Sequence, residues 1–287
     1  TGAPDVNDSK TADNHAVGAY TSHVTGLTGN TKYYVRAYVT DAQGVTKYGE
    51  ERSATTPPFN GVGTTEAPYQ IETLDDLRFL VQHSRYWDRY FVQTADIDAA
   101  QTQYWDDTDD DGDGRLYNDA NDQNADGTNE GFLPIGSNDI PFSGTYDGNG
   151  HTVSNLTVVR DHSSLRPTGL FGAVSGGTIQ NVGVINASIT GKGENGGLAG
   201  QVHESIIQGT FATGTVTGTG WRTGGLLGYC DDATMLSNSY STCNVSGDDK
   251  VGGLIGDWQV NDADYDGRVV NTYSIGSVTG NTDVGGL

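Results

Sequence analysis

The sequence predicts an all-β protein whose main part is a right-handed parallel β-helix, or β-solenoid. A capping helix is expected at its N-terminal side, preceded by a partial β-sandwich. The chain of 287 residues contains 42 glycines, about twice ordinary usage. A Gly-Leu-x-Gly tetrapeptide recurs at a fixed interval, and a second short pattern recurs in phase with it. A single repeat is too short to bury its own apolar side chains, so successive repeats must stack.

The Gly-Leu-x-Gly repeat runs from residue 168 to residue 287. Four copies follow one another at equal intervals along the chain. Their leucines are Leu170, Leu198, Leu226 and Leu254. We expect these leucines to form one buried column inside stacked coils. A fifth copy opens at Gly286, so we also expect the natural protein to continue with further repeats, or a partner chain to cover this end.

A second pattern places an aliphatic residue between two small polar residues. The aliphatic positions are Ile189, Val216, Val245 and Val278. In strands of this alternation the aliphatic side chains point inward and their polar neighbours point outward. Six outward hydroxyl residues are candidates for a ligand-binding array: Thr190, Thr215, Thr217, Ser246, Ser277 and Thr279. A flat array of this kind could bind ice or glycans, although threonine and serine are also ordinary outward residues of strands.

One segment before the repeats has the pattern of a helix. Thr73 is suited to the N-cap, and Asp76 stands three residues later as the partner of a capping box. Leucine and valine side chains then recur on one face: Leu74, Leu77, Leu80 and Val81. We expect this helix, at 73–84, to close the N-terminal end of the solenoid, where strands would otherwise expose unpaired backbone groups.

A separate segment at 1–57 precedes the solenoid and is joined to it by a linker at 58–66. Between Tyr33 and Val39, residues alternate with the period of a half-buried strand. A turn follows, and then a returning strand. The stretch resembles the last strands of a fibronectin type III domain, in which a leucine and a tyrosine six residues later form a corner; here they are Leu27 and Tyr33. The resemblance implies a partial sandwich over 1–57.

The repeats themselves resemble the GLUG repeat of bacterial surface proteins. The preceding block, 134–159, resembles the capping coils that come before such repeats, so the resemblance spans about residues 67–287. It implies a solenoid cap and first coils at 67–167, followed by repeats at 168–287. Members of the family are mainly adhesins and other repeat-bearing surface proteins, some attached to extracellular peptidases. The peptidase motif His-Glu-x-x-His does not occur in this sequence.

An acidic insert at 105–131 is the candidate metal site. Aspartate or asparagine stands at alternate positions and is followed by glycine at the sixth position, twice in succession. Oxygen ligands with this spacing let a loop curl around one hard cation such as Ca2+. The candidate ligands are Asp107, Asp109, Asp111, Asp113, Asp122, Asn124 and Asp126, with Asp119 and Glu130 as completing groups.

The spacing of the insert resembles the calcium loops of EF-hand, dockerin and thrombospondin type 3 proteins, which implies one or two bound calcium ions. It departs from the EF-hand because the twelfth position is not glutamate, and from thrombospondin type 3 because the cysteine is missing. A solvated acidic loop is the alternative. Carboxylates this dense would repel one another strongly without a cation.

Charge and composition exclude other function classes. Lys and Arg number 15 and Asp and Glu number 37, so the net charge is −22, which repels nucleic acid. No stretch of the sequence approaches the ~18 apolar residues of a membrane-spanning helix. The two cysteines, Cys230 and Cys243, could form one disulfide or remain a buried free pair.

We therefore predict a non-catalytic segment of a large secreted bacterial protein, located at the cell surface, that acts as an adhesin or structural fibre stabilised by Ca2+. Its partners would be glycans or proteins of host or neighbouring cells, or further copies of itself. One alternative is a glycan- or ice-binding solenoid that uses the hydroxyl array.

The other alternative is a carbohydrate-active enzyme of the β-helix class, a polysaccharide lyase or a glycosidase. Such enzymes need clustered basic or acidic residues. The repeats contain four basic residues, which we expect at corners of different repeats rather than in one cluster: Lys192, Arg222, Lys250 and Arg268. The adjacent carboxylate pairs are 231–232 and 248–249, and His203 is the histidine that could lie near them.

Overall fold

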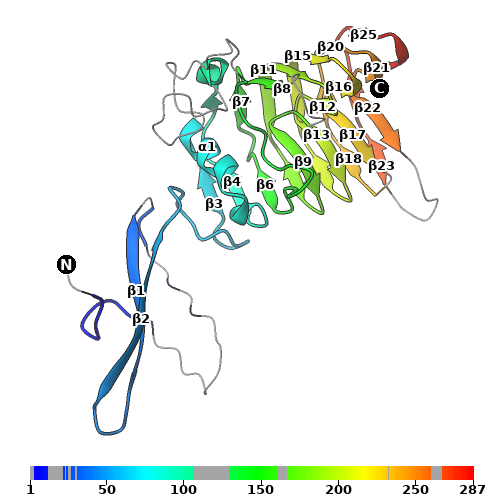
Figure 1. Cartoon of the computed structure of the whole chain (residues 1–287). Helices are drawn as coiled ribbons and strands as arrows, with labels where there is room; N and C mark the ends of the chain where they lie inside the picture. Colours follow the sequence, from blue (N-terminus) through cyan, green and yellow to red (C-terminus); the bar gives the residue numbers. More distant parts are fainter. Residues whose placement is uncertain are drawn as a thin grey trace. The chain divides into compact units, whose positions relative to one another are not determined.

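The computed structural model consists of two compact units, residues 1–62 and 63–287. The boundary between them falls inside the predicted linker at 58–66. Figure 1 shows the course of the chain through both units. The structure describes the following residues: 3–11, 22, 24, 27–29, 31–105, 130–160, 167–231, 233–259 and 267–287.

The first unit contains an antiparallel hairpin of β1 (Lys32–Thr40) and β2 (Thr46–Thr55). Asp41 begins its turn by accepting hydrogen bonds from the backbone N–H groups of Gln43 and Val45 at 3.0 and 2.8 Å. The Tyr33 hydroxyl accepts a hydrogen bond from the backbone N–H of Thr28 at 2.9 Å. In the described part of this unit these two strands make up the sheet, and the fibronectin type III resemblance stays a prediction.

The second unit is a parallel β-solenoid, as the sequence predicts. Its strands form four sheets, and every paired strand in them runs parallel to its neighbour. The first sheet contains β3 (Tyr69–Ile71), β4 (Tyr90–Gln93), β6 (Thr145–Asp147), β10 (Thr178–Gln180), β14 (Ile206–Gln208), β18 (Met235–Ser237) and β23 (Arg268–Val270). The second contains β5 (Ile97–Asp98), β7 (Thr152–Ser154), β8 (Thr157–Arg160), β11 (Gly183–Gly191), β15 (Phe211–Gly218), β19 (Tyr240–Ser241), β20 (Asn244–Ser246), β24 (Tyr273–Ser274) and β25 (Val278–Thr279).

The third and fourth sheets hold the strands on either side of the Gly-Leu corners. The third contains β9 (Phe171–Ser175), β13 (Ala199–His203), β17 (Leu227–Asp231) and β22 (Ile255–Gln259). The fourth contains β12 (Asn195–Gly196), β16 (Trp221–Gly224), β21 (Asp249–Gly252) and β26 (Thr282–Gly285). From β9 onward the chain passes through all four sheets in each coil, so residues one repeat apart lie in neighbouring strands (Figure 1).

The predicted leucine column is confirmed. All four leucine side chains have 0% exposed surface. The backbone N–H of Leu198 donates to the carbonyl of Leu226 at 3.0 Å, and that of Leu226 donates to the carbonyl of Leu254 at 2.9 Å. The aliphatic residues of the second pattern also lie in register, with Ile189 beside Val216. The constant spacing of the leucines therefore aligns the corners of successive coils, and the strands of the second pattern stay in register although their spacing varies.

The predicted helix is confirmed as α1 (Leu74–Gln82), which buries Leu77, Leu80 and Val81. Thr73 and Asp76 form the capping box: the Asp76 N–H donates to Thr73 Oγ1 at 3.2 Å, and the Thr73 N–H donates to Asp76 Oδ2 at 2.9 Å. In Figure 1, α1 lies at the end of the stack where β3 is the edge strand of the first sheet. Two short 3-10 helices follow: η1 (Ser84–Tyr86) and η2 (Ala100–Tyr104).

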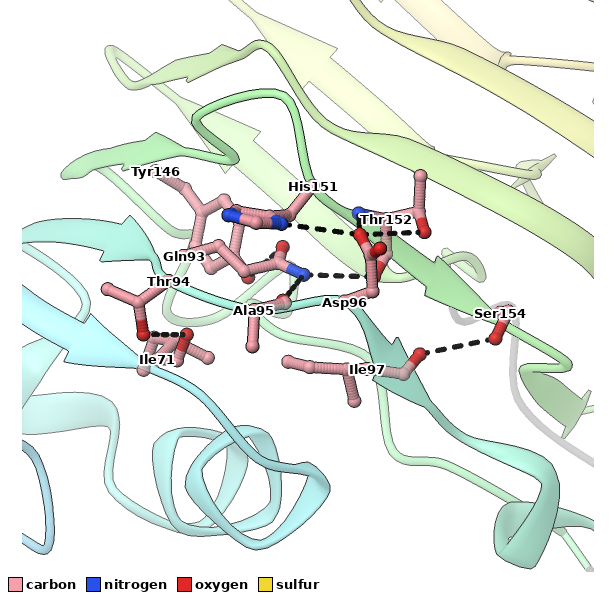
Figure 2. A network of polar contacts seen from close by, with 10 residues as sticks. All are labelled: Ile71, Gln93, Thr94, Ala95, Asp96, Ile97, Tyr146, His151, Thr152 and Ser154. Atoms are coloured by element: carbon pink, nitrogen blue, oxygen red, sulfur yellow. Dashed lines mark hydrogen bonds and ion pairs between the residues drawn. The ribbon is translucent and has the colours of Figure 1, made fainter.

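A polar network joins the capping segment to the first coil (Figure 2). The side chain of Gln93 is fully buried. It accepts a hydrogen bond from the Tyr146 hydroxyl at 3.0 Å and donates to the carbonyl oxygens of Ala95 and Thr152 at 2.8 and 2.9 Å. These bonds satisfy its buried amide. The network therefore fixes the register between the cap and the strands that follow.

Asp96 makes the exposed part of this network. Its Oδ1 accepts from the backbone N–H of Thr152 at 2.9 Å and lies 3.3 Å from Nδ1 of His151 (Figure 2). The pKa of the Asp96 carboxyl is lowered, mainly by the hydrogen bond from the Thr152 N–H and to a smaller extent by the His151 side chain. His151 thus has a structural place at a turn.

No helix in the described part of the chain is long and apolar enough to cross a membrane.

Candidate functional site

The predicted hydroxyl array lies on the outer surface of the second sheet. Its six residues occupy two columns across β11, β15, β20 and the segment 277–279, which contains β25, and their side chains are exposed or half-buried. The aliphatic residues between the columns point inward; Ile189, Val216 and Val245 are at most 2% exposed. The outward orientation is therefore confirmed. Ligand binding by this array stays a prediction.

Hydrogen bonds link neighbouring coils within this array. The hydroxyl of Ser277 donates to Oδ1 of Asn244 at 2.7 Å, and the hydroxyl of Ser246 donates to Oγ1 of Thr217 at 3.3 Å. Asn244 occupies the same column as Thr215, with which it is paired in register. The array is thus a mixed surface of hydroxyl and amide groups, and part of its hydrogen-bonding capacity is used between coils.

An aromatic ladder stands beside the hydroxyl array on the same sheet. The rings of Phe211 and Tyr240 have centroids 5.0 Å apart with planes 3° from parallel. Those of Tyr240 and Tyr273 are 4.9 Å apart and 2° from parallel. Because the ring faces cover one another, the inner faces are not available as platforms for a ligand. The ladder instead fixes the register of three coils.

A second polar surface lies where the third and fourth sheets meet. We call it the charge cluster and define it by Glu194, Arg222, Lys250 and Asp257. Arg222 donates from Nη1 to Glu194 Oε1 and from Nε to Asp257 Oδ2, both at 2.9 Å. Lys250 Nζ donates to the same Asp257 oxygen at 3.0 Å. The guanidinium also lies 4.5 Å from the ring centroid of Tyr229, a cation–π contact.

The charge cluster corrects the expected separation of the basic residues. Arg222 and Lys250 lie in register on β16 and β21, between the pairs Trp221–Asp249 and Thr223–Val251. Asp257 in β22 brings both of them to one carboxylate. Two of the four basic residues of the repeats are therefore neighbours. Their separation by one repeat was visible in the sequence, but the bridging role of Asp257 was not.

His203 does lie beside a carboxylate on the third sheet. Its Nδ1 is 3.0 Å from Oδ2 of Asp231. The other oxygen of Asp231 accepts from the hydroxyl of Thr234 at 2.8 Å and from the backbone N–H of Glu204 at 3.1 Å. The carboxylate side chain is 14% exposed. Both of its oxygens are thus engaged by groups of the protein.

The acidic insert has described residues only at its two ends. The Gly131 N–H donates to the carbonyl of Trp105 at 2.8 Å, so the ends of the insert are held together. Glu130 is buried, and its carbonyl accepts from Nη1 of Arg160 at 2.6 Å. The other candidate calcium ligands, at 107–126, lie outside the described residues. Among the described residues no group of three or more His, Cys, Asp or Glu side chains is arranged for a metal ion.

Both cysteines are free and buried. Burial raises the pKa of the Cys243 thiol to about 11. Burial also raises the pKa of the Cys230 thiol, with a further contribution from the nearby Asp231 carboxylate. The thiolate is the reactive form of cysteine, and a raised pKa keeps both thiols protonated. Both cysteines therefore act as packing residues rather than as nucleophiles.

Comparison with known proteins gives two likenesses, and no family model matches the chain. The chain is 34% identical over 229 residues to halomucin of Haloquadratum walsbyi. The alignment covers 77% of this chain and 2% of halomucin. Among solved structures it resembles that of a candidate immunoglobulin A1 protease of Bacteroides ovatus. The TM-score is 0.52 at 22% identity, over 77% of this chain and 61% of that chain. At this identity the structural likeness shows the fold alone.

These likenesses limit what carries over to this chain. The chain spans 2% of the length of halomucin, so the activity of the whole relative is not transferred with the alignment. Haloquadratum walsbyi is an archaeon, and the comparison therefore gives no support for the predicted bacterial origin. The GLUG resemblance also stays a prediction, since no family model matches.

Proposed function

We propose that this chain is a non-catalytic structural segment of a large extracellular surface protein. The observation that carries the proposal is the likeness to halomucin: 77% of this chain aligns with 2% of that protein, as expected for one module within a very long chain. A stack of parallel coils is suited to this role because each coil contacts only its neighbours and the stack extends in one direction.

The packing of the coils supports a stiff segment. A buried leucine column, an aromatic ladder and hydrogen-bonded side chains on the surface all run along the stacking direction. Bending the stack would separate these groups on one side. Interiors packed in this way resist deformation. The segment would therefore hold other parts of the surface protein, or of a fibre built from it, at a fixed distance.

The use of charged groups supports a non-catalytic function. In the charge cluster, Arg222 and Lys250 share the carboxylate of Asp257, and Arg222 also binds Glu194. His203 faces Asp231, whose oxygens accept from Thr234 and Glu204. General acid or base catalysis needs a group that can reach a substrate proton. Here the acids and bases are directed at one another across coils.

Calcium binding by the acidic insert is part of the proposal. The hydrogen bond between Trp105 and Gly131 closes the ends of the insert, which lowers the entropy cost of ordering the loop around an ion. Calcium would neutralise part of the local negative charge. The ion would thereby stabilise the first coils, to which Glu130 is attached through Arg160. The partners of the assembled protein would be glycans or proteins of other cells.

The location can be tested on cells that produce the chain. Intact cells are labelled with a membrane-impermeant amine reagent and then treated with an external protease. We expect the parent protein to be labelled and its solenoid peptides to be released, while a cytosolic enzyme measured in parallel stays unlabelled. Recovery of the parent protein only after lysis, and unlabelled, would overturn the proposal. Cleavage of a panel of polysaccharides by the purified chain, whether by hydrolysis or by β-elimination, would overturn its non-catalytic part.

A further inference from the structure

We propose that Asn244 is an N-glycosylation site, so that the hydroxyl array carries a covalently attached sugar. The segment Asn244-Val245-Ser246 has the form Asn-x-Ser/Thr, in which an amide nitrogen is modified when a hydroxyl stands two residues later. The inference rests on the extracellular location proposed above. It assigns to this surface a modification rather than the binding of a free ligand.

The strand geometry places the groups of this tripeptide correctly. Val245 is 2% exposed and points into the core. Asn244 and Ser246 therefore point to the same outer side of β20, as alternate residues of a strand do. Asn244 is exposed and Ser246 is half-buried. An enzyme approaching this face of the sheet thus meets the amide and the hydroxyl side by side.

The hydrogen bonds of Asn244 leave the reactive nitrogen free. Its Oδ1 accepts from the backbone N–H of Ser277 at 3.3 Å and from the Ser277 hydroxyl at 2.7 Å. A backbone N–H can only donate, so these contacts fix the carbonyl oxygen on that side. Nδ2 then points away from Ser277. Within the described residues, Nδ2 of Asn244 donates to no protein acceptor.

Two similar tripeptides on the same sheet differ from this one in the hydrogen bonds of the asparagine Nδ2. They begin at Asn155 and Asn186. Nδ2 of Asn155 donates to Asp98 Oδ1, and Nδ2 of Asn186 donates to Asn155 Oδ1, both at 2.8 Å. Both asparagines also have left-handed backbone angles, with φ of 59° and 54°. Their amide nitrogens already connect neighbouring coils, so the structure selects Asn244 among the three.

The surroundings of Asn244 leave room for a sugar. Its column neighbours are Thr215 and Ser277, which are small and exposed. A sugar attached to Nδ2 would lie over these hydroxyl columns and cover them. The flat array would then be shielded from other β-sheets, and no free ligand would reach it.

The transfer uses a glycosyl donor with a lipid-linked diphosphate leaving group, supplied by a membrane glycosyltransferase. Nδ2 of Asn244 attacks the anomeric carbon, and a carbon–nitrogen bond forms as the carbon–oxygen bond to the diphosphate breaks. The amide proton passes to a base of the transferase, and the diphosphate leaves with its electron pair. No oxidation or reduction takes place. The hydroxyl of Ser246 is the group by which the transferase recognises the amide.

Mass spectrometry of the protein recovered from the surface of producing cells tests this inference. We expect the peptide containing Asn244 to carry a glycan mass, and that mass to disappear in Asn244→Gln and Ser246→Ala. Ser246→Thr keeps the hydroxyl and should keep the glycan. Ser277→Ala removes a contact of Asn244 but leaves the tripeptide intact, and it should also stay modified. The melting temperature of each variant shows whether it has folded.

Several results would overturn the assignment. An unmodified Asn244 peptide in surface-labelled protein would refute it while leaving the proposed function intact. A glycan found only at Asn7, Asn155 or Asn186, each of which also begins an Asn-x-Ser/Thr tripeptide, would refute it as well. So would a glycan at Asn244 that persists in Ser246→Ala. Absence of the parent protein from the cell surface would instead refute the proposed location, on which the modification depends.

Discussion

Arg222 and Asp257 connect two sheets and two layers of the solenoid. Nε of Arg222 on β16 donates to Oδ2 of Asp257 on β22 at 2.9 Å, and the side chains are 21% and 13% exposed. Tyr229, which is paired in register with Asp257, lies under the guanidinium. Arg222 thereby connects the corner between the third and fourth sheets to the next coil.

We expect Arg222→Met to destabilise the solenoid by about 3 kcal/mol, because it leaves the carboxylates of Glu194 and Asp257 largely buried with fewer partners. Chemical denaturation of both proteins measures the difference. Arg89→Met is the matched control. Its side chain is 52% exposed in a pair with Asp88, and exposed pairs contribute under about 1 kcal/mol. Equal effects of the two substitutions would contradict a structural role for the charge cluster.

The leucine column gives a second prediction. Leu226 lies between Leu198 and Leu254 and is fully buried, so Leu226→Ala should cost about 2–5 kcal/mol through lost burial and the cavity it leaves. Ile206 is 43% exposed, and Ile206→Ala should change the unfolding free energy by only about 0.5 kcal/mol. Thermal denaturation followed by circular dichroism provides the comparison. A loss at Leu226 no larger than the loss at Ile206 would contradict tight packing of the column.

Much of this solenoid could be predicted because its Gly-Leu-x-Gly tetrapeptide recurs at a constant step in four successive copies. The constant spacing of Leu170, Leu198, Leu226 and Leu254 brings chemically equivalent residues into neighbouring strands, so the leucine column and the outward hydroxyls follow from counting. The capping helix was also predictable, since its capping box acts locally. Features that repeat with the coil, or that depend on neighbouring residues alone, could therefore be predicted from the sequence.

The charge cluster and the Asn244 site were missed for different reasons. Arg222 and Asp257 are separated by more than one repeat along the chain, so periodicity gives no sign that they meet. Asn244 begins an Asn-x-Ser tripeptide that a motif search would have found. The same search would have found Asn7, Asn155 and Asn186 equally. Among the three tripeptides on the second sheet, the hydrogen bonds of the amide groups and the backbone angles of the asparagines distinguish Asn244.

A glycine in the asparagine turns offers a third test. Gly209 has φ of 61°, close to the values at Asn181 and Asn238 in the equivalent turns of neighbouring coils, 53° and 51°. A Cβ at Gly209 would lie 3.0 Å from the side-chain oxygen of Asn181, and this contact is the same for every side chain placed there.

Gly209→Asn should therefore be close to neutral, because asparagine tolerates this backbone conformation. Gly209→Val should cost about 1–2 kcal/mol for the left-handed conformation. Urea denaturation of the two variants, which share the same position, gives the difference directly. Equal stability of the asparagine and valine variants would show that the turn does not impose its backbone angle.

The cysteines allow a test of burial by thiol reactivity at pH 8. With a pKa of about 11 for Cys243 and a raised pKa for Cys230, both thiols stay protonated in the folded protein at pH 8. We expect no reaction with a thiol-specific disulfide reagent at pH 8 until the protein is unfolded, when two thiols should react. Ser188→Cys, at an exposed position, should react at once and serves as the control. Immediate reaction of the unchanged protein would contradict the burial of its cysteines.

The acidic insert provides the last prediction. Calorimetric titration of the metal-free protein should show uptake of one or two calcium ions, and chelation should lower the melting temperature. An ion that binds only the folded state adds about 2.7 kcal/mol when its concentration is 100 times its dissociation constant. Replacing Asp109, Asp111, Asp122 and Asp126 by asparagine should abolish both effects. Asp139→Asn, at an exposed position in the same unit, should change neither. If the unchanged protein gave no heat and no shift on chelation, the insert would be a solvated acidic loop.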